Sequence, residues 1–462
     1  MNILISTLIA FYIEHKSAVY IKNFFFMRKK YLYPFVLLII SIIIGIGWPS
    51  VIIEVFKTGE KNRPVQLYYA DHISPSHQFA IDEFNRLHRG KIEVIPVNLP
   101  FSKFSTNERK ELLTRSLRSK SEKLDIFGVD LIWVPRFAKW CEPLDSYFST
   151  EEKKRLLPDA MRSCVFDGAL VAMPMYLDVG LMYYRRDIIQ RLPDGDAIEK
   201  RLQESITWEE MTRLRRRLGY MNKPFYIFPA KNFEGLVCNF FELAMSYDPE
   251  FLRSNTFDLL SPPAAKSLHM MVDFVKNGTT PSVVTDFDEY LCNTYMLDHD
   301  GVFIRSWPDF VQTFRTLYSH PQKLKYIAKA PLPHFEGKPR TSVFGGWNLM
   351  VSKSSTKKEA AIEFIRFFQS ESIQRMIFER MGYLPAINSV YEDSAFQRTH
   401  SELAFFHQLL RHGFHRPAIV EYTQVSDIIS HFANSAIKQE LSVEEALRRS
   451  DELIRSHEVL IK

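Results

Sequence analysis

The sequence predicts an α/β protein of two lobes that follows a single membrane-spanning helix. Strand-like and helix-like segments alternate from Val65 onward, which is typical of parallel sheets with helical crossovers. The chain beyond residue 64 is too long for one compact core, so we expect two lobes. Residues 31–53 carry no charge, and an apolar run of that length is long enough to cross a bilayer.

The uncharged run also sets the expected side of the membrane. Arg28, Lys29 and Lys30 precede it, and basic residues stay on the cytoplasmic side. A cleaved signal peptide is the alternative, but its apolar region is normally shorter and ends in small residues. We therefore expect a retained anchor and an extracytoplasmic domain, either periplasmic or extracellular.

Four segments follow from this orientation. They are a cytoplasmic N-terminus at 1–30, a transmembrane signal anchor at 31–55, a tether at 56–64, and the outer domain. Met27 and the three basic residues after it have the form of a signal-anchor start, so we expect translation to begin at Met27. A second short membrane-associated segment before it is the weaker alternative, because the apolar run there is too short to span.

Charge and cysteine content exclude several classes of protein. The net charge of +5 is small for this length, and basic and acidic residues are interspersed, which argues against a nucleic-acid partner. The widely spaced cysteines form no C-x-x-C pair, so we expect no zinc ribbon and no redox site. None follows the apolar run closely enough to carry a lipid. One disulfide stays open as an alternative to buried free thiols. The four are Cys141, Cys164, Cys238 and Cys292.

The outer domain opens with a β-α-β pattern. Strand character over residues 65–69 is followed by a helix that Ser74 caps and Gly90 ends, and strand character resumes over 92–97. Serine is a preferred N-cap because its hydroxyl accepts a hydrogen bond from a free backbone N–H. This opening predicts a parallel sheet.

The pattern repeats further along the chain. A polar helix over 107–120 leads to a strand at Asp125–Asp130 and a helix at Trp133–Trp140. Ligands of parallel α/β sheets bind beyond the carboxyl ends of the strands. Asp130 and Trp133 occupy such an end.

The middle of the chain is more helical, and strands return near residue 300. Thr207 and Glu210 have capping-box spacing, and a further helix is expected over 261–276. Strands are expected at 301–304 and 345–351. Thr356 and Glu359 have capping-box spacing too, and the helix they open has these residues on its apolar face: Ala361, Phe364, Ile365 and Phe368.

Six blocks in one order resemble the family 1 extracellular solute-binding proteins, the maltose- and trehalose-binding type of bacterial ABC importers. The blocks are Asp125–Asp130 with Trp133, Gly168–Gly180 with Tyr183 and Tyr184, Thr207-Trp208, Trp307-Pro308, Gly345-Gly346-Trp347, and Gly382–Pro385. The resemblance implies a periplasmic-binding-protein-like fold of type II, with two α/β lobes joined by a hinge. The expected hinge crossings lie near 174–178, near 304–308 and near Ser370. Lobe 1 would then comprise 65–175 and 305–369, and lobe 2 would comprise 176–304 and 370–462.

The resemblance also implies a sugar site in the cleft between the lobes. Sugars offer hydroxyl groups to carboxylates and apolar faces to aromatic rings. Each candidate has a plain alternative: a tryptophan packs in the core, Asp130 caps a helix, and the paired glycines form a turn. The residues that match ligand-holding positions of the family are Asp130, Trp133, Tyr176, Asp178, Trp307, Gly345, Gly346 and Trp347.

The expected function is capture of a sugar or oligosaccharide and its delivery to an ABC permease, without catalysis, cofactor or metal. His407, His412 and His415 do not share a helical face, and no hydrolase or nucleotide-binding motif is present. A glycosidase that uses Asp130 and Asp178 is one alternative, because paired carboxylates also serve hydrolysis. A ligand-sensing subunit for a membrane signalling partner is another. A polyol, a glycerol phosphodiester or a peptide would fit the same scaffold.

Overall fold

The structure is a computed structural model that describes residues 63–100, 103, 106–253, 256–319 and 321–456. Val65–Lys462 form one compact unit. Within the described ranges, no helix combines the length and the apolar character that a membrane span requires. The predicted cytoplasmic segment 1–30, the predicted anchor 31–55 and most of the tether lie outside the described residues.

The first sheet contains the predicted β-α-β opening. Its strand order is β12-β11-β3-β1-β2, and β6 pairs with the other edge of β11. Strands β2 and β3 run parallel to β1, whereas β11 runs antiparallel to both β3 and β6. The bounds are β1 (Val65–Asp71), β2 (Ile92–Asn98), β3 (Ile126–Asp130), β6 (Met173–Val179), β11 (Ser342–Val351) and β12 (Gly413–Phe414).

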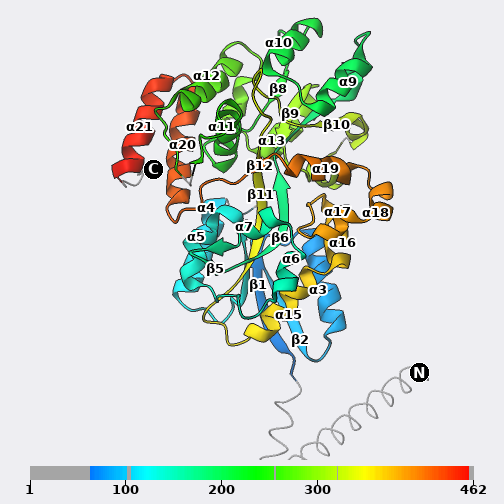
Figure 1. Ribbon diagram of the computed structural model, residues 1–462, viewed down its shortest axis with the longest axis vertical. Coiled ribbons are helices and arrows are strands. Elements are labelled where there is room, and N and C mark those ends of the chain that lie inside the picture. Colours follow the sequence, from blue (N-terminus) through cyan, green and yellow to red (C-terminus); the bar gives the residue numbers. More distant parts are fainter. Residues whose placement is uncertain (1–62, 101–102, 104–105, 254–255, 320, 457–462) are drawn as a thin grey trace, which may run out of the picture. The chain divides into compact units, whose positions relative to one another are not determined.

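A second sheet lies apart from the first (Figure 1). Its order is β10-β7-β9-β8, with β7 antiparallel to both of its neighbours and β8 parallel to β9. The bounds are β7 (Leu181–Arg185), β8 (Tyr226–Ile227), β9 (Phe303–Ser306) and β10 (Ile327–Ala330). A short hairpin joins β4 (Val165–Phe166) to β5 (Ala169–Leu170).

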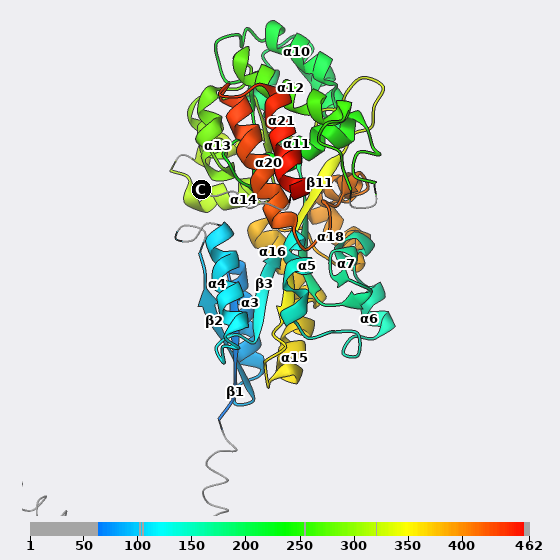
Figure 2. The ribbon, with the colours of Figure 1, turned by 90° about the vertical axis from the view of Figure 1, so that its left-hand side faces the viewer.

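Helices pack on each sheet. Helices α3 and α15 contact each other and the first sheet, whereas α11, α12, α20 and α21 pack together in the second group of elements (Figure 2). The longer helices are α3 (Pro75–Leu87), α4 (Thr106–Arg118), α9 (Gly195–Glu204), α10 (Trp208–Arg217), α11 (Glu234–Tyr247), α12 (Pro262–Lys276), α13 (Glu289–Asp298), α14 (Phe310–Leu317), α15 (Lys358–Phe368), α16 (Glu371–Met381), α19 (Glu402–Leu410), α20 (Tyr422–Ile437) and α21 (Val443–Ser456). The shorter ones are η1 (Leu131–Trp133), α5 (Val134–Phe137), η2 (Ala138–Trp140), α6 (Thr150–Lys154), α7 (Pro158–Arg162), α8 (Arg186–Ile189), η4 (Ser282–Asp286), η5 (Pro321–Tyr326), α17 (Asn388–Glu392) and α18 (Ser394–Thr399).

Two of the three predicted helix caps are confirmed. The Ser74 hydroxyl accepts a hydrogen bond from the backbone N–H of His77, and Thr207 and Glu210 form a reciprocal capping box. The predicted box at Thr356 is wrong. Helix α15 begins at Lys358 without a side-chain cap, and the nearby serine hydroxyl, that of Ser355, accepts from Lys357 and donates to Asp125. The predicted apolar face of α15 is buried as expected.

The chain passes from the first sheet to the second at Gly180, which separates β6 from β7. The predicted boundary lies at 175/176, within β6. Strand β10 pairs antiparallel with β7, whereas the predicted boundaries place these two strands in different lobes. Strand β10 is part of the second sheet, because a strand belongs to the sheet whose neighbours satisfy its backbone N–H and C=O groups.

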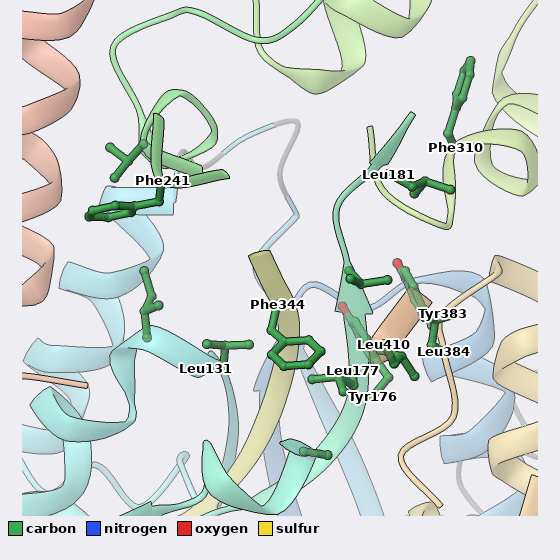
Figure 3. Packing of buried hydrophobic residues seen from close by; sticks show 14 of the residues in the cluster. Leu131, Tyr176, Leu177, Leu181, Phe241, Phe310, Phe344, Tyr383, Leu384 and Leu410 are labelled. Atoms are coloured by element: carbon green, nitrogen blue, oxygen red, sulfur yellow. The ribbon is translucent and has the colours of Figure 1, made fainter. Parts of the chain in front are cut away.

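One apolar cluster extends across this passage. Leu177 of β6, Leu181 of β7 and Phe344 of β11 are all buried in it (Figure 3). The four cysteines all lie in the described residues and are buried free thiols, so no disulfide joins them. Among the described residues, the two sheets therefore share one apolar cluster and are not joined by a disulfide.

Candidate functional site

Strand β11 brings six of the predicted site residues together: its own Gly345, Gly346 and Trp347, and three on the neighbouring strands. Trp347 pairs in register with Asp130 of β3 on one side and with Tyr176 of β6 on the other. Gly345 pairs with Asp178 of β6. Because β11 is antiparallel to both neighbours, residues that are far apart in the sequence become cross-strand neighbours here.

Trp347 rests on Trp133. The two indoles meet edge to face, with ring centroids 5.7 Å apart and an interplanar angle of 77°. Trp133 is only 2% exposed, whereas Trp347 is half-buried. The Arg109 guanidinium lies 4.5 Å from the Trp347 ring centroid. Trp133 is thus a core residue that supports the more accessible ring of Trp347.

Trp307 lies against Gly345. A Cβ atom at position 345 would come within 2.8 Å of the Trp307 ring and 3.4 Å of the Asp178 Cβ. The Trp307 Nε1–H donates to Glu289 at 3.2 Å, and the Arg305 guanidinium lies 4.0 Å from the ring centroid. Gly345 therefore makes room for the indole beside Asp178.

Glycine is required at position 346 for a different structural reason. Its φ of +130° is a conformation that residues with a Cβ rarely adopt, and a Cβ there would lie 2.5 Å from the Tyr176 carbonyl oxygen. Glycine at 346 lets β11 approach β6 closely. The paired glycines are thus part of a strand and do not form the turn that we considered as an alternative.

Asp178 is a buried carboxyl group that lacks a full set of partners. Asp178 is 8% exposed, and its Oδ1 has no hydrogen-bond partner among the described residues. Burial and the neighbouring Asp309 carboxyl raise the pKa of Asp178 well above its usual value. Burial also raises the pKa of Asp309, to about 6.

Asp130 caps the short helix η1, as the plain alternative predicted. Its Oδ1 accepts a hydrogen bond from the backbone N–H of Ile132 at 3.1 Å. The Arg416 guanidinium lies 3.5 Å from the same oxygen. Burial raises the pKa of Asp130, and the charge of Arg416 opposes that rise.

Tyr176 stacks on Tyr383, which lies in the predicted Gly382–Pro385 block. The ring centroids are 4.2 Å apart and the planes differ by 5° (Figure 3). Tyr176 is 6% exposed. The pair forms an aromatic wall beside β6, with one face of each ring already occupied by the other.

Sequence reasoning missed three buried arginines at this junction. Each forms an ion pair with a carboxylate from a distant part of the chain, so sequence spacing gave no signal for the pairing. The pairs are Arg109 with Asp71 at 2.8 Å, Arg305 with Glu242 at 2.7 Å, and Arg416 with Glu234 at 2.6 Å.

Two cavities of the described structure lie elsewhere, and none of the eight predicted residues lines them. One, of about 20 Å³, lies between Tyr226, Met271 and Leu332. The other, of about 210 Å³, is a polar groove beside Lys266 and His269. The candidate site is therefore defined by the convergence of side chains around β11.

Comparison with known proteins places the chain among binding proteins. The family model described as bacterial extracellular solute-binding protein matches residues 80–402. A Deinococcus radiodurans protein named "Probable ABC transporter-binding protein" is 24% identical over 352 residues, which cover 74% of this chain and 82% of the relative.

Solved structures have the same fold. A maltose-bound MalE3 of T. maritima matches with a TM-score of 0.75 and 25% identity, over 85% of this chain and 100% of the other. A Thermotoga lettingae solute-binding protein with bound α-D-tagatose matches with a TM-score of 0.73, 19% identity, and 85% and 99% coverage. A ribitol complex from Agrobacterium radiobacter matches with a TM-score of 0.72, 17% identity, and 86% and 100% coverage.

Proposed function

Because the chain belongs to the bacterial extracellular solute-binding proteins, we propose that it captures a sugar or oligosaccharide between two closing lobes and delivers it to an ABC permease. The observation that carries this proposal is the convergence around β11 of two half-buried indoles, those of Trp307 and Trp347, with the carboxyl groups of Asp130 and Asp178. Aromatic rings stack on apolar sugar faces, and carboxylates accept strong hydrogen bonds from hydroxyl groups.

The structural neighbours support this class of ligand. Maltose, tagatose and ribitol are named as the bound molecules of three proteins with the same fold. The family consists of solute-binding proteins and not of enzymes, so this chain is a binding protein. This excludes the glycosidase alternative. The Deinococcus relative is named for ABC transport, which favours import over the sensing alternative.

The proposed lobes follow the two sheets. Lobe 1 comprises 65–179 and 342–414, and lobe 2 comprises 181–330 and 422–456. The crossings then lie at Gly180, between β10 and β11, and between β12 and α20. A ligand that contacts both lobes stabilises the closed form, because only that form offers both sets of contacts.

The domain of this family is extracytoplasmic, and we propose that the uncharged run at 31–53 holds it at the membrane. A tether raises the local concentration of the binding protein near its permease. The anchored form would therefore load the transporter without free diffusion. Cell fractionation before and after removal of residues 31–55 tests the anchor: the intact chain should sediment with membranes, and the shortened chain should not.

Ligand titration of the full chain tests the proposed function. We expect intrinsic tryptophan fluorescence to change on addition of a member of a panel that contains maltose, tagatose, ribitol and mannitol. Small-angle scattering of the same samples should report compaction with the same ligand. If no sugar, neutral or charged, and no polyol changes either signal, the proposed function is wrong.

A further inference from the structure

The charges at the candidate site are not balanced. Each of the three buried guanidinium groups already has its own carboxylate, in the pairs of Arg109, Arg305 and Arg416 described above. Asp178, Asp309 and Glu289 remain, and among the described residues none of the three takes part in an ion pair. Glu289 accepts a hydrogen bond from the Trp307 indole and is influenced by the charge of Arg305. Asp178 and Asp309 therefore lack a protein cation.

Asp178 faces acidic neighbours. The Asp309 carboxyl and, more weakly, that of Asp130 disfavour its ionisation, and the backbone N–H of Leu384 is the group that favours it. Its Oδ1 is buried without a partner, while its Cβ lies next to the Trp307 ring across Gly345. An unpaired carboxylate oxygen of this kind is costly unless a ligand satisfies it.

Asp309 lies at the start of α14, two residues beyond Trp307. Its Oδ2 accepts a hydrogen bond from the Thr313 hydroxyl at 3.1 Å. That hydroxyl is neutral, and burial raises the pKa of Asp309, so the ionised form of this carboxyl group has no protein cation to stabilise it.

Asp178 lies near the end of β6 and Asp309 follows the end of β9, so the two aspartates come from different sheets. The Cα of Asp309 lies 3.2 Å from a Cβ built at Gly382. Gly382 lies two residues before Leu384, and Leu384 forms a backbone bridge with Leu177, next to Asp178.

Aromatic side chains lie near both carboxyl groups. The phenol of Tyr183 donates to the carbonyl oxygens of Trp307 and Pro308 next to Asp309. Tyr176 lies two residues before Asp178 in β6 and stacks on Tyr383. A cation is attracted both by carboxylates and by ring faces. A neutral hydroxyl group satisfies one oxygen but compensates no charge, and an anion would be repelled by both aspartates.

We propose that the captured solute carries a protonated amino group, and that this group lies between the carboxyl groups of Asp178 and Asp309 beside Trp307. This inference rests on the proposed function and narrows its ligand class to amine-bearing sugars. The ammonium donates to the unpartnered Oδ1 of Asp178 and compensates the second carboxylate. The glycerol phosphodiester that the scaffold would otherwise accommodate is disfavoured.

Matched pairs of probes test the charge requirement on the full chain. The pairs are glucosamine with glucose, and the glucosamine dimer with its N-acetylated form, each titrated by tryptophan fluorescence in the presence of EDTA. The chelator removes divalent cations that would otherwise compete for two carboxylates. We expect the amine to bind at least about tenfold more tightly than its neutral counterpart.

Asp178→Asn and Asp309→Asn should reduce this preference to less than about threefold, because the amide keeps the shape and removes the charge. Asp82→Asn, an exposed site on α3, makes the same change in net charge and should leave the preference intact.

The melting temperature of Asp178→Asn should be equal to or higher than that of the wild type, since the substitution removes a buried carboxyl group without a partner. A lower melting temperature would indicate a folding defect in Asp178→Asn, and the preference for the amine is then measured with Asp309→Asn.

The outcomes separate the two proposals. Equal binding of amine and neutral probes, or a preference that survives both substitutions, overturns the charge inference and leaves sugar binding standing. Absence of binding by every probe here and by the neutral panel overturns the proposed function, and the charge inference with it.

Discussion

At the scale of single residues, exposure separates the three tryptophans of the site. Trp133 is buried beneath Trp347, while Trp307 and Trp347 are half-buried. A buried indole contributes mainly to folding, because its removal leaves a cavity. A half-buried indole at a binding site contributes to ligand affinity through its exposed face.

Trp347→Ala should weaken sugar binding by on the order of 1–3 kcal/mol and change the melting temperature little. The reason is that the Trp347 side chain is only half-buried, so its removal from the protein should cost less packing than removal of a core indole. Calorimetric titration with the sugar identified by the panel measures the affinity, and thermal unfolding measures stability. A large drop in melting temperature with unchanged affinity would contradict this role.

Trp133→Ala is the contrasting variant. It should lower the free energy of unfolding by roughly 3–5 kcal/mol, because the cavity lies in the core. Chemical denaturation of the two variants side by side checks the difference. Similar stability losses for both would mean that Trp347 is also a core residue.

The pKa of Asp309 predicts a pH dependence of stability. Burial raises this pKa from 3.8 to about 6 in the folded chain. Between these values the folded protein keeps a proton that the unfolded chain releases, so the free energy of unfolding falls as pH rises from about 4 to 6 and this contribution is constant above that range. Asp309→Asn removes the contribution. Denaturation of both proteins at several pH values should show the wild type losing stability relative to the variant as pH rises, and the opposite slope would refute the assignment.

At the scale of elements, β11 depends on its two glycines. It pairs with β3 and β6 and lies at the centre of the site. Gly345 leaves room for the Trp307 ring, and Gly346 allows the close approach of β6. The position of β11 between its neighbours therefore depends on glycine at 345 and 346 as well as on the side chains that the strand carries.

Gly346→Ala should destabilise the protein by roughly 2–5 kcal/mol, since it adds both a disfavoured φ and a clash with backbone. Gly90→Ala is the matched control. Gly90 also has a positive φ of +79°, but nothing lies within 4 Å of the added Cβ, so about 1 kcal/mol is expected. Equal losses in chemical denaturation would show that the clash at 346 relaxes freely.

At the scale of the whole folded unit, Arg416 links the two groups of elements. It pairs with Glu234 of α11 and lies near Asp130 of β3, and it donates to the Phe344 carbonyl at 3.2 Å. Glu234 also accepts a hydrogen bond from the Tyr422 hydroxyl at 2.9 Å. This network joins segments that are far apart in the sequence.

Arg416→Met should cost about 3–5 kcal/mol of unfolding free energy, because it leaves two buried carboxyl groups without their cation. Combining it with Glu234→Gln should recover part of that loss, since one of those charges is removed. Denaturation of the single and double variants measures both effects. A double variant that is less stable than Arg416→Met would contradict the proposed charge compensation.

Local interactions explain how much of the fold could be predicted. The β-α-β opening, the Ser74 cap and the Thr207 capping box all depend on residues a few positions apart, and they are confirmed. The Thr356 box failed because Ser355 instead bonds to Asp125, a distant residue. The pairing of β10 with β7 joins strands that are far apart in the sequence, so sequence spacing could not predict it.

By itself, the sequence predicted the α/β class from its alternation of strands and helices. Its motif blocks resemble the solute-binding family, and that resemblance pointed to eight candidate residues at or near β11. Only the tertiary structure decided which of those residues are core, which carboxylate each buried arginine takes, and that Asp178 and Asp309 are left without an ion pair among the described residues. The physical reason is that every carboxylate side chain can form an ion pair with every guanidinium group, so residue type alone does not specify the partner. Burial and proximity depend on how distant segments pack, and sequence spacing does not carry that information.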